Sequence, residues 1–330
     1  MENFDIVAIG DTATDTFIRL KDASVNCDIN REHCLLSLRF GDKVPYEFVE
    51  IVRAVGNSAN AAVAGARLGL KTALVGNIGD DDNGVECLAA LRGSGVSADF
   101  ISIQAGKHTN YHYVLWYEDE RTILIKHESF AYTLPDIGSP QWMYLSSMGE
   151  EAVPLYDLIP AYIDAHPGTR LAFQPGTYQI KLGTEKLAGI YAHTDIFFCN
   201  TDEAERILKH KNTDIKMTLK GIRELGAKTV IITDGVKGAY AYHENDMWYM
   251  PAYPDPKPPY ERTGAGDAFS STVVSALAMG KTIDEALRWG PINSMSVVQK
   301  IGAQAGLLTM PEIERYLAHS PADYAPKKIS

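Results

Sequence analysis

The sequence has few cysteines and no long hydrophobic run. Its four cysteines form no Cys-x-x-Cys pair, which argues against a zinc site or a disulfide framework; they are Cys27, Cys34, Cys87 and Cys199. We expect buried free thiols in a reducing compartment, and therefore a cytoplasmic protein. No stretch approaches the roughly 18 apolar residues that a membrane-spanning helix needs, and the acidic N-terminal segment does not resemble a signal peptide.

Positive charge is also scarce. The chain has 31 Lys and Arg against 42 Asp and Glu, a formal net charge of −11, and no basic run longer than a pair. This composition argues against a nucleic-acid-binding surface, so we expect small-molecule partners and neither nucleic acid nor membrane. An acidic protein that handles phosphates needs local hydrogen-bond donors and a cation such as Mg²⁺.

Two common nucleotide-binding motifs are absent. The "GKT" segment at Gly280 resembles part of a P-loop, but a P-loop requires glycine where this chain has Ser275. The dinucleotide pattern Gly-x-Gly-x-x-Gly fails because Gly264 and Gly266 are followed by Phe269. Any nucleotide site in this chain would therefore be built in another way.

Strands alternate with helices along most of the chain. Continuous apolar runs such as "DIVAIG" and "TVIITDG" predict buried strands, and the stretches between them predict helices. This order predicts an α/β fold of three layers, with a mostly parallel central sheet and helices on both faces. Two segments, 16–55 and 109–130, instead alternate apolar and polar residues, which predicts a small separate β-sheet. Segments 1–15, 56–108 and 131–330 would form the α/β core.

A glycine-rich turn followed by a carboxylate is the most informative stretch. In "RTGAGDAF", Gly264, Ala265 and Gly266 precede a predicted helix from Asp267, and bare N–H groups at a helix start bind anions. A carboxylate there opposes phosphate binding, but it can take the proton of a hydroxyl that attacks a phosphate. Taken alone, the pattern also fits an aspartate that merely caps a helix.

Together with this stretch, five further segments resemble the ribokinase-like, or PfkB, carbohydrate kinase family. They are "GNSANAAVAGARLG" at 56–69, "GNIGDDDNG" at 76–84, "NTDEAE" at 200–205, "TDGVKGAY" at 233–240 and "KIGAQAGLL" at 300–308. Their order and spacing are similar to the family's over residues 4 to 310. The resemblance implies a ribokinase-like fold and an ATP-dependent carbohydrate kinase.

The resemblance implies roles for residues on the phosphate-donor side. Asp267 would be the catalytic base, and the N–H groups of Gly264, Ala265, Gly266 and Asp267 would form an anion hole for the transferring phosphate. The implied ATP-binding residues are Asn200, Thr233, Gly235, Gly238, Gly264, Gly266 and Asn293. Asn200 and Glu203 would act near Mg²⁺ through water, since Mg²⁺ prefers oxygen ligands and keeps several waters.

The resemblance also implies where the acceptor binds. The implied residues provide carboxylates and amides for sugar hydroxyls; they are Asp11, Asp15, Gly56, Asn57 and Asn60. The two alternating segments would form a lid over this site. Because a small sheet with one apolar face needs cover, a homodimer formed through the lid is also expected.

The chain departs from the family pattern at four positions. Glu261 and Arg262 replace the Asp and the small polar residue that usually begin the last signature. That Asp is associated with a monovalent-cation site in several members, so its replacement argues against K⁺ activation. Asn57 replaces a second glycine and would add a hydrogen bond to the acceptor. Gln174 stands where Asp or Asn is common and would alter the polar surface near the phosphates.

Three functions fit these residues. An ATP-dependent kinase that acts on the hydroxymethyl group of a sugar is favoured. A nucleoside kinase is the alternative, since four aromatic residues between positions 111 and 117 could stack on a base, although they also suit apolar cover of the sheet. A regulator that binds sugar and nucleotide without catalysis is the third, and the intact Asp267, Asn200 and Glu203 argue against it.

Overall fold

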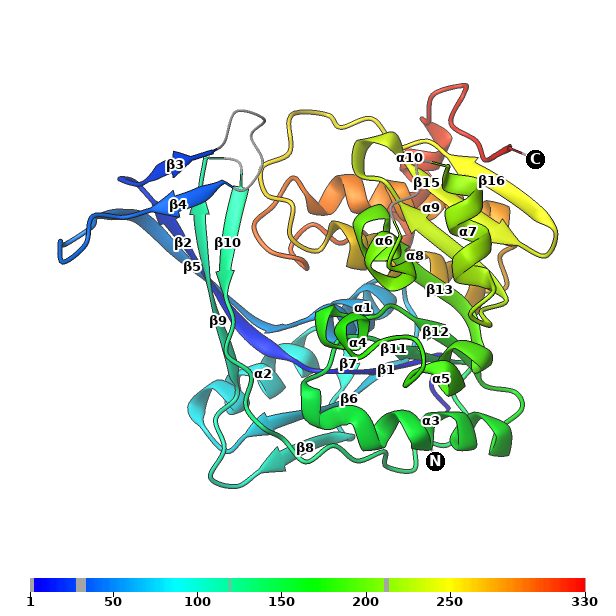
Figure 1. Ribbon diagram of the computed structural model, residues 1–330, viewed down its shortest axis with the longest axis horizontal. Helices are drawn as coiled ribbons and strands as arrows, with labels where there is room; N and C mark the ends of the chain where they lie inside the picture. The colour runs from blue at the N-terminus through cyan, green and yellow to red at the C-terminus, as the bar shows by residue number, and fades with distance from the viewer. Residues whose placement is uncertain (1–2, 28–33, 119, 211–213, 330) are drawn as a thin grey trace.

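The computed structural model describes residues 3–27, 34–118, 120–210 and 214–329. Figure 1 shows an α/β body from which a smaller sheet extends at one side. Residues 28–33 and 119, which belong to the predicted lid segments, lie outside the described part of the chain. No helix among the described residues is long and apolar enough to cross a membrane.

The body is built on a sheet of eleven strands within the described residues. Its order is β17-β16-β15-β14-β13-β12-β11-β1-β6-β7, with β8 paired to β6. Neighbouring strands are parallel along the order from β14 to β7, and β8 is parallel to β6. The strands β15, β16 and β17 pair antiparallel with their neighbours. The strands are β1 (Ile6–Ile9), β6 (Thr72–Gly79), β7 (Val96–Ser97), β8 (Ile101–Gln104), β11 (Trp142–Leu145), β12 (Arg170–Phe173), β13 (Thr194–Asn200), β14 (Thr229–Thr233), β15 (Ala239–His243), β16 (Asp246–Met250) and β17 (Lys327–Lys328).

The central strands are buried on both faces. In β1, Ile6 and Ala8 belong to one buried cluster and Val7 and Ile9 to the other, as expected for a strand with period two. Helices α1, α2, α8, α9 and α10 cover the first face, and α3 to α7 cover the second. The predicted three-layer fold is therefore confirmed. The helices are α1 (Asn57–Arg67), α2 (Asp82–Gly93), α3 (Val153–Ala165), α4 (Thr177–Leu182), α5 (Ala188–His193), α6 (Thr201–Leu208), α7 (Ile215–Arg223), α8 (Ala265–Ala278), α9 (Ile283–Val297) and α10 (Met310–Ala318), with short 3₁₀ turns at Glu150–Ala152 and Gly235–Lys237.

The two alternating segments form one four-stranded sheet, which we call the small sheet. Its order is β10-β9-β2-β5, with β2 antiparallel to β5 and parallel to β9. The prediction of a small separate sheet is confirmed, although β2 begins at Ala13, three residues before the predicted start of the first segment at position 16. Two further strands, β3 and β4, pair with each other as an extension beside it (Figure 1). The bounds are β2 (Ala13–Leu20), β3 (Ser24–Asn26), β4 (Leu35–Ser37), β5 (Tyr46–Val55), β9 (Asn110–Tyr117) and β10 (Glu120–Leu124).

The cysteine prediction is wrong for one pair. Cys27 and Cys34 are joined by a disulfide, whereas Cys87 and Cys199 are buried free thiols, as expected. Antiparallel pairing of β3 with β4 brings the ends of the two strands together and places the two cysteines opposite each other. A separation of seven residues does not reveal such pairing, because it depends on where the chain reverses.

Candidate active site

The turn before α8 fixes the position of the first N–H groups of that helix. Gly264 is the N-cap residue and adopts the left-handed region with a φ of 79°. A Cβ atom on Gly264 would lie 2.2 Å from the Cβ of Ala303, so both backbone conformation and space require glycine. The first N–H groups of a helix lack carbonyl partners within it, and the helix dipole adds positive potential there. Residues 264–267 are the predicted anion hole, and for that reason we call them the anion-hole turn.

Asp267 lies in the first turn of α8, where three side-chain amides donate hydrogen bonds to its carboxylate. Asn57 Nδ2 lies 2.8 Å from Oδ1, and Asn60 Nδ2 lies 2.8 Å from Oδ2. Gln174 Nε2 lies 3.0 Å from Oδ1. Asn57 and Asn60, which the resemblance assigns to the acceptor, thus donate to the predicted base. They contact Asp267 because α1 packs against α8 and both amides point toward the start of α8.

Further hydrogen bonds determine which way two of these amides point. Gln304 Nε2 donates to Asn60 Oδ1 at 3.0 Å, which leaves Asn60 Nδ2 free to donate to Asp267. The Tyr144 hydroxyl donates to Gln174 Oε1, so the Gln174 NH₂ group faces Asp267. Gln174, one of the departures from the family pattern, is therefore part of the support of the carboxylate.

The surroundings of Asp267 adjust its proton affinity in both directions. Burial raises the pKa of Asp267 above the ordinary aspartate value, and the amides of Asn60, Gln174 and Asn57 lower it. The positive charge of Arg121 also lowers it, but the pKa remains raised. A raised pKa moves a carboxylate toward the range in which it serves as a general base.

Asp11, two residues after the end of β1, is buried and hydrogen-bonded. The Tyr132 hydroxyl donates to Asp11 Oδ1 at 2.7 Å, and the Gly149 N–H donates to Oδ2 at 2.8 Å. Gly56 lies against the same residue, since a Cβ there would come within 2.6 Å of the Asp11 carbonyl oxygen. The fold therefore brings Asp11 and Gly56 together, at a point where Gly56 has a φ of 115°.

Two histidines that the sequence patterns do not single out lie beside the carboxylates of Asp11 and Asp15. His112 Nδ1 lies 3.1 Å from Asp15 Oδ1, and His127 Nδ1 lies 3.5 Å from Asp11 Oδ2. The two imidazole rings are 5.4 Å apart. His112 Nε2 is buried without a hydrogen-bond partner in the described part of the chain. The result is a cluster of carboxylates and imidazoles, which is suited to an acceptor with several hydroxyl groups.

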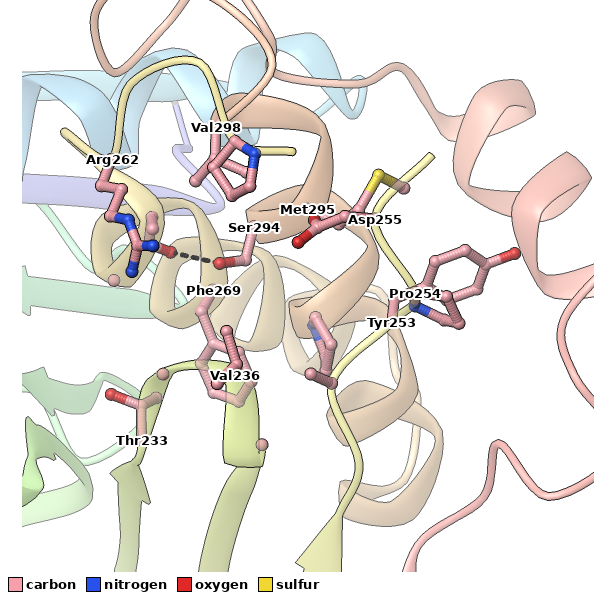
Figure 2. Close-up of a pocket in the computed structure, with 17 residues that line it drawn as sticks. Thr233, Val236, Tyr253, Pro254, Asp255, Arg262, Phe269, Ser294, Met295 and Val298 are labelled. Atoms are coloured by element: carbon pink, nitrogen blue, oxygen red, sulfur yellow. Dashed lines mark hydrogen bonds between the residues drawn. The ribbon is translucent and has the colours of Figure 1, made fainter. Parts of the chain in front are cut away.

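A cavity of about 450 Å³ opens beside the start of α8, and Ala265 and Gly266 form part of its wall (Figure 2). Thr233, Gly235 and Gly238, which the resemblance assigns to ATP, also line it. The volume lies in the range of small-molecule sites. Much of the remaining wall is apolar and suits a flat base; it includes Tyr253, Pro254, Pro291, Met295 and Val298.

Asn293 does not line this cavity. Its side chain is fully buried, where Nδ2 donates to Thr272 Oγ1 at 2.7 Å and Oδ1 accepts the Leu308 N–H at 2.9 Å. The cavity is lined instead by residues 291, 294, 295 and 298, which share one face of the α9 region. The helical period places position 293 on the opposite, core-facing side, so the position of this side chain does not support a contact with adenine.

Arg262 is a functional candidate that the sequence marks only as a departure from the family. Among the described residues that line the cavity, it is the one with a positively charged side chain. Figure 2 shows Arg262 and Thr233 toward one side of the cavity and Tyr253 and Pro254 toward the other. The positive group thus lies on the side of the cavity that faces away from Tyr253 and Pro254.

Asn200 and Glu203 cap α6 reciprocally. Asn200 Oδ1 accepts the Glu203 N–H at 2.8 Å, and Glu203 Oε2 accepts the Asn200 N–H at 2.9 Å. Burial raises the pKa of Glu203, and the negative charge of Asp267 raises it further. In the described part of the chain, no group of three or more His, Cys, Asp and Glu side chains is arranged to hold a metal ion. Asn200 and Glu203 therefore do not form a closed metal site by themselves.

Known proteins are similar to this chain in sequence over most of its length. Residues 52–310 match the model of the pfkB family of carbohydrate kinases. A nucleoside kinase of Methanothermobacter thermautotrophicus is 25% identical over 311 residues, which cover 93% of each chain. A ribokinase of Bacillus subtilis is 27% identical over 272 residues, which cover 80% of this chain and 87% of the relative.

The fold is shared with solved structures as well. The Arabidopsis thaliana ribokinase complexed with ribose and ATP matches it with a TM-score of 0.78 at 19% identity, over 96% of this chain and 99% of that one. At this identity the likeness concerns the fold. Because the family model itself matches well over half of the sequence, the chain belongs to the pfkB family of carbohydrate kinases.

Proposed function

We propose that this protein transfers the γ-phosphoryl group of ATP to the hydroxymethyl group of a sugar or sugar-like acceptor. The observation that carries the proposal is the position of Asp267. Its carboxylate lies in the first turn of α8, next to the N–H groups of the anion-hole turn. Ala265 and Gly266 of that turn line the cavity of about 450 Å³, which we propose holds ATP and call the donor cavity. A base and an anion site at one point are what phosphoryl transfer to an alcohol requires.

Asp267 would accept the proton of the acceptor hydroxyl. The hydroxyl oxygen then forms a bond to the γ-phosphorus, the bond from that phosphorus to the bridging oxygen breaks, and ADP leaves. The N–H groups of Gly264, Ala265, Gly266 and Asp267 would stabilise the negative charge of the transferring group. The amides of Asn57, Asn60 and Gln174 would keep the carboxylate aimed at the acceptor throughout.

The residues near Asp267 also suit Mg²⁺ as cofactor. When bound, Mg²⁺ neutralises charge on the ATP phosphates. The negative charge of Asp267 raises the pKa of Glu203, and a carboxylate that feels such a charge favours a cation in its vicinity. Asn200 Oδ1 and Glu203 Oε2 are occupied in the α6 cap, so these residues would hold the cation through water. Arg262 would complete the neutralisation from the wall of the donor cavity.

The acceptor side favours a sugar over a nucleoside. Asp11, Asp15, His112 and His127 offer hydrogen-bonding groups for several hydroxyls. Trp116, by contrast, is only 2% exposed and so is not free to stack on a base. The nucleoside kinase relative keeps a nucleoside as the second candidate acceptor, since it matches this chain over 93% of its length.

Segments 16–55 and 109–130 would act as the lid, and the lid would form the contact of a homodimer. The pairing of Thr16 with both Ile51 and Tyr113 places those two side chains on one face of the small sheet. Ile51 is 42% exposed and Tyr113 is 47% exposed, so this apolar face needs cover. A cytoplasmic location is part of the proposal, because ATP is the phosphate donor.

An ADP-release assay with Mg²⁺ and a panel of sugars, sugar acids, sugar phosphates and nucleosides tests the proposal. ADP release that depends on a sugar or sugar acid, with the phosphate found on the hydroxymethyl group by NMR, is the expected result. A strong preference for nucleosides would replace the sugar with the second candidate. Absence of ADP release with every acceptor would refute the kinase activity. Analytical ultracentrifugation tests the dimer.

A further inference from the structure

The Glu261 carboxylate connects both sides of the anion-hole turn. It is buried, Oε1 accepts hydrogen bonds from the N–H and the hydroxyl of Thr263, and Oε2 accepts the Gly302 N–H at 3.4 Å. Thr263 directly precedes Gly264, and Gly302 directly precedes Ala303, which packs against Gly264. Glu261 therefore ties together the two loops that shape the turn.

Arg121, on β10 of the small sheet, provides the positive charge that faces this carboxylate. Its Nε lies 3.5 Å from Glu261 Oε1, and this is the ion pair found for Glu261 within the described residues. The Arg121 side chain is 26% exposed, and its Nε is buried without a hydrogen-bond partner in the same part of the chain. Because a buried carboxylate is unfavourable unless it is compensated, the charge of Glu261 depends on a residue that the small sheet carries.

Apolar contacts join the small sheet to the same two loops. Trp116 on β9 packs edge-on against Tyr260, with ring centroids 4.9 Å apart. Val52 on β5 and Phe17 on β2 both lie against Gly302. Arg121 on β10 adds the fourth strand, so every strand of the small sheet contacts the loops that hold the anion-hole turn.

We propose that Arg121 is a positioning residue that couples the docked position of the small sheet to the geometry of the anion-hole turn through Glu261. This role rests on the kinase activity proposed above. With the sheet docked over the acceptor, Arg121 neutralises Glu261, and Glu261 holds Thr263 and Gly302 in place. With the sheet displaced, the buried carboxylate loses its counter-charge and the turn loses support. Phosphoryl transfer is then favoured only over a covered site, which limits the hydrolysis of ATP by water.

The charge of Arg121 also affects the base. Burial raises the pKa of Asp267, and Arg121 is the positive group among those that lower it. Two further titratable groups whose pKa values are raised by the charge of Asp267 are Glu203 from α6 and Tyr144 from β11. Loss of the Arg121 charge therefore raises the pKa of Asp267, and the base becomes protonated at a higher pH.

Single substitutions at Arg121 test the coupling. Arg121→Gln should lower kcat roughly 10- to 100-fold, as expected for a displaced catalytic group. The KM for ATP should not change, and the acid limb of the pH–rate profile should move to higher pH. Arg121→Lys should restore part of both properties. Arg92→Gln, at an exposed arginine in the last turn of α2, is the matched control and should behave as the unmodified protein. An unchanged kcat in Arg121→Gln would overturn the proposal.

The double variant R121Q/E261Q separates coupling from simple neutralisation of Glu261. It removes the unpaired buried carboxylate, so it should regain the thermal stability that R121Q loses. Under the proposed role it should still show the low kcat and the shifted pH profile. Recovery of both to the values of the unmodified protein would overturn the proposal, because the turn would then work without a link to the small sheet and Arg121 would serve only to offset a buried charge.

Failure of the kinase activity itself has a different signature. If the unmodified protein releases no ADP with any acceptor, the proposed function is wrong. Thermal unfolding of the variants still tests the contact between Arg121 and Glu261. The Tm values of R121Q, E261Q and the double variant form a cycle that needs no activity. Non-additive Tm changes support the coupling of Arg121 with Glu261, and additive changes overturn it.

Discussion

The Nδ2 atom of Asn57 lies 2.8 Å from Oδ1 of Asp267, although the two residues are 210 positions apart in the chain. Asn57 is the first residue of α1, and Asp267 lies in the first turn of α8. The two helices pack against each other on one face of the central sheet. The orientation of the proposed base is therefore set by helix packing, and substitutions on either helix should affect its chemistry.

Asp267→Asn should keep ATP binding and lose most turnover. The amide cannot accept the proton of the acceptor, whereas the turn at Gly264 stays intact. General bases contribute roughly 10²- to 10⁴-fold to rate, so a loss in that range is expected in the ADP-release assay. Calorimetric titration with ATP checks that the donor cavity is unchanged. Asp157→Asn, an exposed carboxylate on α3, is the control. Near-normal turnover of Asp267→Asn would rule out the base assignment.

Asn57→Ala should move the acid limb of the kcat/KM profile to higher pH. Burial raises the pKa of Asp267, and the Asn57 amide is one of the groups that lower it, so removal of the amide raises the pKa further. A hydrogen bond to a charged group is worth roughly 1.5–3 kcal/mol, which corresponds to a shift of about one pH unit or more. An acid limb that stays in place would mean that Asn57 contacts the acceptor and does not tune the base.

Gly264 and Gly280 form a matched pair at the two ends of α8. Both have a φ of 79°, but a Cβ on Gly280 would meet no atom within 4 Å, whereas one on Gly264 would collide with Ala303. Gly280→Ala should cost only backbone strain, about 1 kcal/mol, and keep turnover. Gly264→Ala should unfold at a lower temperature than Gly280→Ala and lose turnover, because the turn must shift. Equal effects in thermal unfolding and turnover would contradict the steric requirement at Gly264.

Arg262→Gln should raise the KM for ATP about tenfold, as expected for loss of one charge-assisted hydrogen bond. The KM for the acceptor should stay the same, since Arg262 lines the donor cavity. The effect should shrink as salt is added, because the side chain is exposed and its charge is screened. Lys186→Gln, an exposed basic residue away from the cavity, is the control. An ATP KM that does not respond would remove Arg262 from the donor site.

Turnover should not depend on K⁺. Glu261 faces the Arg121 guanidinium at 3.5 Å, so a positive charge is already present at the position where the family resemblance associates an acidic residue with a monovalent cation. Replacement of K⁺ by tetramethylammonium at constant ionic strength should leave kcat unchanged. A marked rise of kcat with K⁺ would show that a cation still binds here.

The backbone elements and the order of the motifs could be predicted from the sequence. β1 corresponds to a continuous apolar run, and the strands of the small sheet correspond to segments that alternate apolar and polar residues. Both patterns indicate strands from residues that are neighbours in the sequence. The turn at Gly264 could also be predicted, because glycine lacks the side chain that opposes a positive φ. Such features depend on residues close together in the chain.

Side-chain partners could not be predicted in the same way. Asn60 and Gln174 turn toward Asp267, Asn293 turns into the core, and Arg121 reaches Glu261 from another sheet. Each of these outcomes depends on how two elements distant in sequence pack, and on which face of a helix or strand meets the neighbour. The sequence alone thus determined the fold class and the chemistry available at the start of α8. Only the tertiary structure decided which groups surround that chemistry, because a hydrogen bond or an ion pair needs its two partners within a few ångströms of each other.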